Sequence, residues 1–527
     1  MPGRSPPRPA GPWNPSARPC ARTSAPEHAN DALQKITFWV AAGSVVIGVA
    51  ARVVACLDDL WFDEVWSVLI VRDYVHSPLD VFTNFKHSNN NHLNSLWLWL
   101  MGYGAWPPLY RVPSLIASVG TIALAGLIGG RPSAGGAAMR DRLGARVAVT
   151  IASWSYLLIH FGTEARGYSA VVFFVLLAWY ALLRFEDHRA WRWAVVYWLA
   201  VVLGFLAHLE FIACCGAIAL WSIWRTFRHR VTWAQSVADL LILHAVPAVL
   251  SSVFYFVSIR GMKIGTGPAY ALTPLLVKTA SYTVGGAAGG VLGWTAALAM
   301  VGAAVLAIGW LVYQRSDQWL FYLPALATPL LLLAIHRPDQ LYPRYFMANV
   351  AAYLVLVPRP LAALMRRGPS GLGVGAILLV VFIAGNAVDT ASLLRYGRGQ
   401  YLAALRFMEQ QAAGGKLVIA SDQDLRNGLL VEYYRDYLEH PGQVAYMGSL
   451  TQAKELRERG ELAQRPEWFL ADRFEIPRGP DSGYRDKFGN RYRLIAVYQY
   501  SDLSGWHWLI YHNIDRPLIA PAQPLMR

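Results

Sequence analysis

The sequence predicts an all-α polytopic membrane protein, with about 11–13 transmembrane helices, that carries a small C-terminal α/β domain. Of its 527 residues, 55% are hydrophobic and 15% are charged, a composition too apolar for a soluble protein. Apolar runs of roughly 20 residues, the length that a helix needs to cross a bilayer, recur between residues 36 and 391. After residue 398 short strand-like runs alternate with helical ones, which indicates a soluble α/β domain.

The apolar runs define a transmembrane domain over 36–391. We expect its spans at 36–56, 110–130, 145–161, 168–185, 192–207, 210–225, 236–259, 290–313, 318–335, 342–360 and 372–391. A long loop, 57–109, follows the first span. Within it the run 93–106 is too short to cross a bilayer and precedes two prolines, so we expect a half-inserted or interfacial helix there. Residues 1–35, rich in Pro, Arg and Ala, are expected to form a disordered tail.

Arginines in the short loops set the orientation of the spans. Four basic loops, at 131–146, 184–192, 225–230 and 359–367, fall on the same side as the N-terminal tail. The positive-inside rule makes this side cytoplasmic. We therefore expect the loop 57–109 and the C-terminal domain on the outer face of the cell inner (cytoplasmic) membrane. The same rule explains the formal net charge of +14, so we expect a lipid bilayer and no nucleic acid as a partner.

The C-terminal domain is expected to span 398–527. Its strand-like runs are 416–420, 443–447, 468–471, 493–500 and 506–511, and its helical runs are 424–438 and 452–461. The sequence of this region has no glycine-rich phosphate loop and no metal-ligand spacing. We therefore expect it to bind a substrate or to act as a structural cap, and not to carry the chemistry.

Two adjacent acids, Asp63 and Glu64, follow the first span and lie among Trp61, Phe62 and Trp66. One interpretation is a pair of solvated loop acids, or an acid that caps the next helix. The aromatic flanks instead suit the membrane interface, where desolvation raises the pKa of a carboxyl unless a cation lies nearby. Such a carboxylate can serve as a general base or as a metal ligand.

A second polar cluster in the same loop contains His87, Asn91 and His92. Two histidines five residues apart do not share a helix face, and zinc would need a further spaced ligand. Hydrogen bonds to a sugar or a phosphate are the alternative that we favour. Asn91 is also a good N-cap for the helix that follows, and that role is compatible with binding.

Further charged residues lie at the same expected face. Glu164 and Arg166 follow the third span, where they form either an interfacial ion pair or a second acid facing Asp63 beside a cation. Arg344 begins a late span from the outer side, and its guanidinium can bind a phosphate bidentately or reach lipid headgroups. Lys263 is a further candidate for binding the phosphate.

Four motifs in this order resemble the GT-C superfamily of membrane glycosyltransferases. The resemblance is to bacterial relatives of the protein O-mannosyltransferases and of the lipid A aminoarabinose transferase. The motifs are WFDE (61–64), NNNHLNSLWLWL followed by RVPSLIAS (89–118), TEARGY (163–168) and YPRYF (342–346). They cover about residues 36–360. The sequence departs from the family in reading NHLNS where a proline-rich form is common, and in having Glu164 where many members have Asp.

The resemblance implies an inverting enzyme that moves a sugar from a polyprenyl-phosphate donor to a hydroxyl of a lipid, glycan or protein acceptor on the outer face. Asp63 is then the general base, Glu64 orients it or binds the sugar, and Glu164 is a further catalytic acid. The expected substrate-binding residues are His87, Asn91, His92, Arg166, Lys263, Arg344 and Tyr345. Metal use varies across the superfamily, so the sequence leaves the cofactor open: a divalent metal ion is one candidate, with Asp63 and Glu164 as its candidate ligands.

The sequence has no dinucleotide-binding fingerprint, which favours a lipid-linked donor over a nucleotide sugar. The main alternative is a transporter or flippase for lipid-linked sugars or glycans, which predicts internal repeats and broken helices near the middle of the membrane. A membrane-embedded ligase or acyltransferase would use His87 or His92 instead. In a purely structural assembly factor the two adjacent acids would be replaceable.

Overall fold

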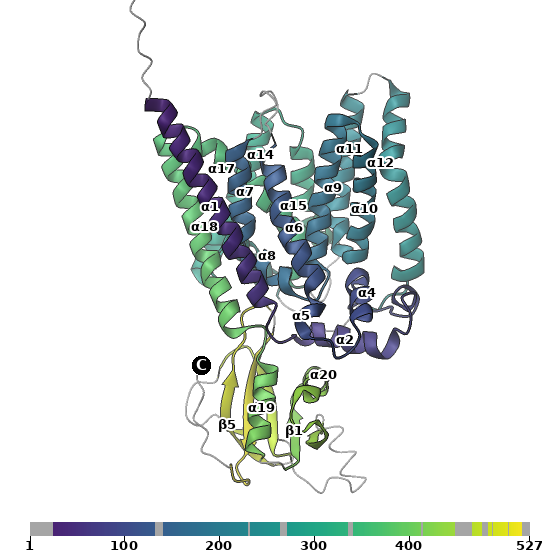
Figure 1. Cartoon of the computed structure of the whole chain (residues 1–527), viewed down its shortest axis with the longest axis vertical. Coiled ribbons are helices and arrows are strands. Elements are labelled where there is room, and N and C mark those ends of the chain that lie inside the picture. The colour runs from purple at the N-terminus through teal and green to yellow at the C-terminus, as the bar shows by residue number, and fades with distance from the viewer. Residues whose placement is uncertain are drawn as a thin grey trace, which may run out of the picture.

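The computed structural model describes residues 25–131, 141–229, 232–263, 271–335, 341–412, 415–447, 466–476, 483–486, 489–503 and 505–518. Residues 1–24 of the expected tail and the expected helix 452–461 lie outside these ranges. A helical bundle and an α/β domain are stacked end to end, and the short helices of the first loop lie between them (Figure 1). The first helix starts at the end of the bundle that is remote from the α/β domain (Figure 1).

The eleven expected spans are all helical. They are α1 (Ala25–Ala55), α6 (Val112–Gly129), α7 with α8 (Arg142–Trp154, Tyr156–His160), α9 (Tyr168–His188), α10 (Trp191–Ala207), α11 (Ile212–His229), α12 (Trp233–Phe254), α14 (Gly290–Tyr313), α15 (Trp319–Ile335), α16 with α17 (Met347–Leu356, Pro358–Met365) and α18 (Pro369–Tyr396). By length and composition, eight helices among the described residues can cross a membrane, or nine when α7 and α8 count as one bent span. Helices α10 and α15 are shorter apolar helices. The predicted polytopic helical class is confirmed.

The start of α1 differs from the expectation of a disordered tail over 1–35, because the helix begins at Ala25. Residues 27–35 contain Glu, Ala, Leu, Gln and Lys, which are good helix formers, and no glycine or proline. Pro26 falls in the first turn, where its missing N–H costs no hydrogen bond. The tail residues that the structure describes are therefore helical.

Helices α12, α14 and α18 present apolar side chains outward. Val291, Leu306 and Val388 are 81%, 75% and 70% exposed. Exposed apolar surface on this scale is expected where a helix faces lipid instead of water.

A bend of 61° separates α7 from α8 at Ser155. It leaves the last carbonyls of α7 without helical partners. Arg52 of α1, fully buried, donates to the carbonyl oxygens of Ala152 (3.0 Å) and Ser153 (3.0 Å). Gly48 lies against the same turn, since a Cβ there would be 2.6 Å from the Ser153 oxygen. The buried charge therefore caps a broken span, whose end leads directly to Glu164.

The first loop folds into α2 (Phe62–Tyr74), α3 (Asp80–Thr83), α4 (His92–Met101) and α5 (Pro107–Tyr110). The ten residues of α4 extend about 15 Å, half of a bilayer core. This agrees with the expected short helix in the loop. Helix α2 begins with Asp63 and Glu64 in its first turn, where carboxylates interact favourably with the helix dipole.

The C-terminal domain contains α19 (Tyr401–Gln411), α20 (Asp424–Tyr434) and a six-stranded sheet in the order β2-β1-β3-β6-β5-β4. The strands are β1 (Leu417–Ser421), β2 (Val444–Tyr446), β3 (Trp468–Arg473), β4 (Tyr484–Arg485), β5 (Arg491–Tyr498) and β6 (His507–Asn513). Strand β1 runs parallel to both β2 and β3, and the other pairs are antiparallel. The parallel pair β1 and β2 is joined through α20, as a parallel connection requires. The predicted small α/β domain is confirmed.

The two parts share one hydrophobic cluster. Side chains of α2, such as Val65 and Leu69, pack in it together with Leu430 of α20 and Trp468 of β3. Because this cluster is continuous across the boundary, burying it holds the C-terminal domain against the first loop.

The linker between the two parts is fixed by Arg398, which is fully buried. Its guanidinium donates to the Ala55 carbonyl at the end of α1 (3.2 Å) and to the His160 carbonyl at the end of α8 (2.5 Å). The Tyr434 hydroxyl of α20 also donates to the Leu60 carbonyl (2.7 Å). These bonds attach the C-terminal domain to the backbone that leads into α2.

Gly48→Ala is expected to lower the free energy of unfolding by about 1–3 kcal/mol, because the added methyl group meets the bent turn of α7. Gly43→Ala is the control in the same helix. It meets nothing within 4 Å, so it is expected to raise the free energy of unfolding by up to about 1 kcal/mol. Thermal unfolding of the detergent-solubilised protein, followed by tryptophan fluorescence, measures both. Equal effects of the two changes would contradict the close approach.

Candidate active site

A cavity of about 880 Å³ lies where the bundle, the first loop and the C-terminal domain meet. Its bundle wall includes Arg166, His208 and Arg344, and its loop wall includes Asp63. Pockets of this size that combine apolar walls with a few polar groups are typical of ligand sites. Three of the six charged residues singled out in the sequence, Asp63, Arg166 and Arg344, therefore lie around one cavity.

Asp63 forms an ion pair with Arg344 across this cavity. The distance from Asp63 Oδ2 to Arg344 Nη1 is 3.0 Å, and each side chain is 11% exposed. The guanidinium also lies over the rings of Tyr342 (4.3 Å), Trp61 (5.3 Å) and Tyr345 (5.6 Å), which bind cations through their π faces. Its buried Nε has no hydrogen-bond partner among the described residues. Arg344 therefore has hydrogen-bond donors left for a ligand.

Glu64 points away from the cavity and is fully buried. Its carboxylate accepts from Arg111 at 2.8 and 2.6 Å, from the Ala165 N–H at 2.6 Å and from the Trp61 N–H at 3.0 Å. These bonds occupy both oxygens. Glu64 therefore does not line the cavity, contrary to the expectation that it binds the sugar, while the alternative that it orients the base stays a prediction. The sequence analysis also missed Arg111 as its partner.

Arg166 lines the cavity and is held by a polar network on α2 and the loop. Its Nη1 donates to Ser67 Oγ (2.9 Å) and to the side-chain oxygen of Asn89. Its buried Nε has no partner among the described residues. His87 accepts a hydrogen bond from the Asn89 N–H through Nδ1 (3.0 Å), so its Nε2–H can donate a hydrogen bond to a ligand. Burial, and then the charges of Arg166 and Lys263, lower the pKa of His87 and keep the ring neutral.

Asn91 and His92 also line the cavity, but both are buried and bonded. Asn91 occupies the N-cap position of α4, as expected, but its side chain makes no capping hydrogen bond, and its amide donates to the Asn89 carbonyl (3.3 Å) instead. His92 Nε2 lies 2.5 Å from Ser258 Oγ, and burial lowers the pKa of His92 to about 4. Both residues therefore shape the wall, and His87 is the histidine better placed to contact a substrate.

Glu164 does not reach the cavity either, which corrects the expectation that it faces Asp63. It is fully buried, with His160 Nε2 at 3.4 Å and Arg398 Nε at 3.5 Å. Burial alone would raise the pKa of Glu164, but the neighbouring His160 and Arg398 outweigh it and hold the pKa below its usual value. The carboxylate thus anchors the linker arginine.

Lys263 is exposed and does not line the cavity, while its backbone bonds to the loop. Its N–H donates to the Lys86 carbonyl (3.0 Å), and its carbonyl accepts from the Ser88 N–H (2.8 Å). The lysine in the cavity wall is Lys278, which was not predicted. Its ammonium donates to Asp502 of the C-terminal domain at 2.6 Å.

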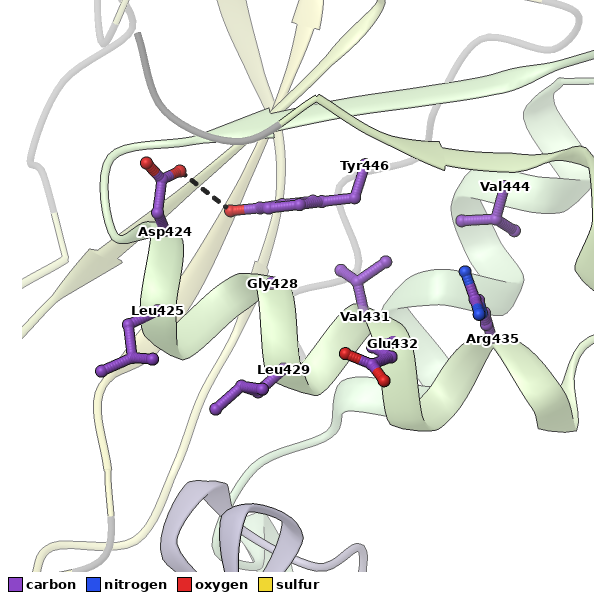
Figure 2. Close-up of a pocket in the computed structure, with 9 residues that line it drawn as sticks. All are labelled: Asp424, Leu425, Gly428, Leu429, Val431, Glu432, Arg435, Val444 and Tyr446. Carbon is purple, nitrogen blue, oxygen red and sulfur yellow. Dashed lines mark hydrogen bonds between the residues drawn. The ribbon is translucent and has the colours of Figure 1, made fainter. Parts of the chain in front are cut away.

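The C-terminal domain supplies part of the wall, through Gln423, Arg426, Asp502 and Trp506. No sequence pattern marks these residues, because polar and aromatic side chains are ordinary on a soluble domain. A second hollow of about 420 Å³ lies on the same domain between α20 and β2. Figure 2 shows Glu432 and Arg435 among its lining residues.

The residues present do not fit a metal site. Among the described residues, no group of three or more His, Cys, Asp or Glu side chains is placed to hold a metal ion. Of the two candidate ligands, Asp63 is paired with Arg344 and Glu164 is enclosed beside Arg398. We therefore derive no step through a metal ion.

This arrangement of a polytopic bundle and a small soluble domain is found in a solved structure. The crystal structure of apo ArnT from Cupriavidus metallidurans is similar, with a TM-score of 0.50 and 14% identity over 91% of this chain and 98% of ArnT. For ArnT bound to undecaprenyl phosphate, the TM-score is 0.48 and the identity is 14%, over 92% of this chain and 99% of ArnT. A third structure is the oligosaccharyltransferase AglB from Archaeoglobus fulgidus in complex with an inhibitory peptide and a dolichol-phosphate. Its TM-score is 0.46 and its identity is 11%, over 83% of this chain and 69% of AglB.

No protein-family model matches the sequence, and no curated protein matches it. At 14% identity the similarity to apo ArnT shows the fold. The GT-C fold that the four motifs predicted is thus confirmed.

Glu64→Gln is expected to lower the free energy of unfolding by about 3–5 kcal/mol, because it leaves the buried Arg111 without a carboxylate. Asp63→Asn is the control at the adjacent position. Asp63→Asn should lower the free energy of unfolding clearly less, since Asp63 faces a cavity. Thermal unfolding in detergent measures both, and equal losses would contradict the assignment of different roles to the two acids.

Proposed function

We propose that the protein is an inverting glycosyltransferase that moves a sugar from a polyprenyl-phosphate donor to an acceptor hydroxyl on the outer face of the cytoplasmic membrane. The observation that carries the proposal is the pairing of Asp63 with Arg344 in a cavity between the membrane bundle and the soluble domain. A carboxylate and a guanidinium are the two groups that such a transfer requires, one for the proton and one for the phosphate.

In the proposed step the acceptor oxygen attacks the anomeric carbon on the face opposite the phosphate. A new carbon–oxygen bond forms while the bond between the anomeric carbon and the phosphate oxygen breaks, and its electron pair stays on the phosphate. The proton of the acceptor hydroxyl passes to Asp63. Attack from the opposite face inverts the configuration at the anomeric carbon.

Arg344 is proposed to stabilise the charge that develops on the departing phosphate. Its free Nε–H and its fork of donors suit two phosphate oxygens. Arg166, whose Nε is also free, lies in the same wall and is the second phosphate ligand. Tyr345 covers the Arg344 guanidinium and restricts its directions.

The buried acids are proposed to position the reacting groups without touching substrate. Glu64 fixes the start of α2, which carries Asp63, through its bonds to Arg111 and to the Trp61 N–H. Glu164 fixes Arg398 and thereby the linker to the C-terminal domain. His87 is proposed to hydrogen-bond the sugar through its free nitrogen.

A transporter for lipid-linked sugars or glycans is the alternative function. It predicts polar residues and broken helices near the middle of the membrane. The bent span of α7 and α8 is a broken helix of this kind, but the residues that line the cavity gather where the bundle adjoins the soluble domain, which favours an enzyme.

Asp63→Asn is expected to lower sugar transfer by about 10²–10⁴-fold, because an amide cannot take the acceptor proton. Asp73→Asn is the control, since Asp73 is an exposed acid of the same helix that pairs with Arg72. Mass spectrometry of cell-envelope glycans, in a deletion strain complemented with each variant, measures transfer. Wild-type glycans with Asp63→Asn would rule out the base. No difference between the deletion strain and the wild type would rule out the transferase.

Ser88→Cys is expected to react with a membrane-impermeant maleimide on intact cells from which any outer membrane has been removed, because the first loop is placed outside. His188→Cys, an exposed position at the end of α9, is the control on the cytoplasmic side. Cys20 and Cys215 are first changed to Ser. If position 188 were labelled on intact cells and position 88 only after lysis, the orientation would be the reverse of the one proposed.

A further inference from the structure

We propose that Arg426 of the C-terminal domain binds an anionic group, a phosphate or a carboxylate, that lies beside the accepting hydroxyl. Arg426 would thus select an acidic acceptor, in a subsite separate from the one that Arg344 provides for the donor phosphate. This inference rests on the proposed function and names the chemical class of its acceptor.

Arg426 lies over two aromatic rings at the edge of the cavity. Its guanidinium carbon lies 5.2 Å from the ring centre of Phe62 and 5.2 Å from that of Trp506, and its side chain is 12% exposed. Phe62 belongs to the first loop and Trp506 to the C-terminal domain, so closure of the two parts forms the clamp. Holding the guanidinium in this way lowers the entropy lost when it binds a ligand.

The hydrogen-bonding capacity of Arg426 is mostly unused within the protein. Of its five N–H donors, the one hydrogen bond to a described residue is a long one, from Nη2 to the Tyr401 hydroxyl (3.4 Å). Its Nε is buried without a hydrogen-bond partner among the described residues, and the carboxylate of Asp472 lies 3.7 Å from it. Buried donors are normally satisfied, so a buried guanidinium with spare donors at a cavity wall indicates a ligand.

Arg426 and Arg344 have similar surroundings, because each lies over one of two consecutive aromatic residues that precede Asp63. Arg344 lies over Trp61, Arg426 lies over Phe62, and Asp63 follows them. Asp63 pairs with Arg344 directly and also acts electrostatically on Arg426. Trp61 is the extended residue before α2 and Phe62 is the first residue of that helix, so the two cations are held over different rings beside the base.

Inverting transfer assigns these two cations to different substrates. The leaving phosphate and the attacking hydroxyl lie on opposite faces of the anomeric carbon, with the base on the side of the hydroxyl. Arg344 starts a bundle span, so a lipid phosphate in the bilayer reaches it first. Arg426 belongs to α20 of the soluble domain, so an acceptor that enters between the two parts meets it first.

The charges around the cavity favour an anion at Arg426 over a neutral sugar. Lys278 is neutralised by Asp502 at 2.6 Å, and Arg344 by Asp63 at 3.0 Å. Arg166 has no carboxylate within 4.0 Å among the described residues, and Arg426 has one only at 3.7 Å. The cavity lining thus carries surplus positive charge. A donor phosphate would neutralise this charge on the side of Arg344, and the charge of Arg426 would remain for a second anion.

The first experiment separates the two subsites, with undecaprenyl phosphate as the probe and the full-length protein in detergent. We expect the lipid to raise the unfolding temperature of the wild type, of Arg426→Gln and of the control Arg435→Gln, which lies in the hollow of Figure 2. Arg344→Gln should lose this shift. A loss of the shift in Arg426→Gln, equal to that in Arg344→Gln, would place Arg426 in the donor site and overturn the proposal.

The second experiment identifies the acceptor and measures its use. The envelope molecule that lacks a sugar in the deletion strain is identified by mass spectrometry, and we expect a phosphate or carboxylate beside the modified hydroxyl. With this molecule purified, Arg426→Gln should raise the acceptor KM about 10- to 100-fold, the usual effect of losing a charge-assisted hydrogen bond. Arg426→Lys, which keeps the charge but loses the fork, should give a smaller increase and tests the proposal if the Gln variant does not fold.

The outcomes are distinct. A neutral acceptor, or an unchanged acceptor KM in both Arg426 variants, overturns the anion subsite and leaves the transferase intact. An unchanged envelope in the deletion strain, together with no shift by undecaprenyl phosphate in the wild type, overturns the proposed function itself.

Discussion

The buried ion pair between Glu64 and Arg111 is the interaction on which the site depends. Arg111 also donates to the carbonyls of Cys56 and Asp58, so one guanidinium holds the end of α1, the turn after it and the start of α2. A buried ion pair adds little net stability over a well-packed apolar alternative, because desolvation offsets the Coulomb attraction. Its effect is geometric, since the charges have one arrangement in which both are satisfied. That arrangement fixes Trp61, Phe62 and Asp63 in space.

The two adjacent acids therefore have opposite roles despite identical local sequence signals. On a helix they point about 100° apart, so only one can face the cavity. Glu64 turns inward to Arg111 and contributes structure, and Asp63 turns outward to Arg344. The same division holds further along the chain, where Arg166 faces the cavity and Glu164 is buried against Arg398.

The sequence was sufficient for features that depend on local pattern. The eleven apolar runs are all helical, although only eight or nine helices among the described residues are long and apolar enough to cross a membrane. The short helix α4 and five of the six strands of the C-terminal domain also lie where the sequence pattern predicted them; β4 was not predicted. A bilayer fixes the length of an apolar run, and a sheet fixes the alternation of a strand. The gathering of Asp63, Arg166, His87 and Arg344 followed from the positive-inside rule, which sorts residues to one face. The structure adds the direction in which each side chain points on that face.

The residues that sequence reasoning missed are those defined by distant partners. Arg111 looked like the entrance of a span, and its partner Glu64 lies 47 residues away. Arg426 is an arginine on an amphipathic helix of a soluble domain, a position where solvent is the ordinary neighbour. Its burial exists only because α20 packs on α2 through the shared hydrophobic cluster. Glu164 was predicted to face the cavity because a charged residue next to a span is usually exposed. It is buried because the distant Arg398 packs against it.

The pairing of Asp63 with Arg344 gives the substrate-free site a built-in order of events under the proposed function. Arg344 Nη1 occupies Oδ2 of Asp63, one of the two oxygens that could accept the proton of the acceptor hydroxyl. A donor phosphate competes for the same guanidinium, and as Arg344 turns toward it, Oδ2 becomes free to accept a proton. The base is thus exposed when the leaving group is in place. An acceptor held by Arg426 then meets a carboxylate that the donor has already released from its own cation.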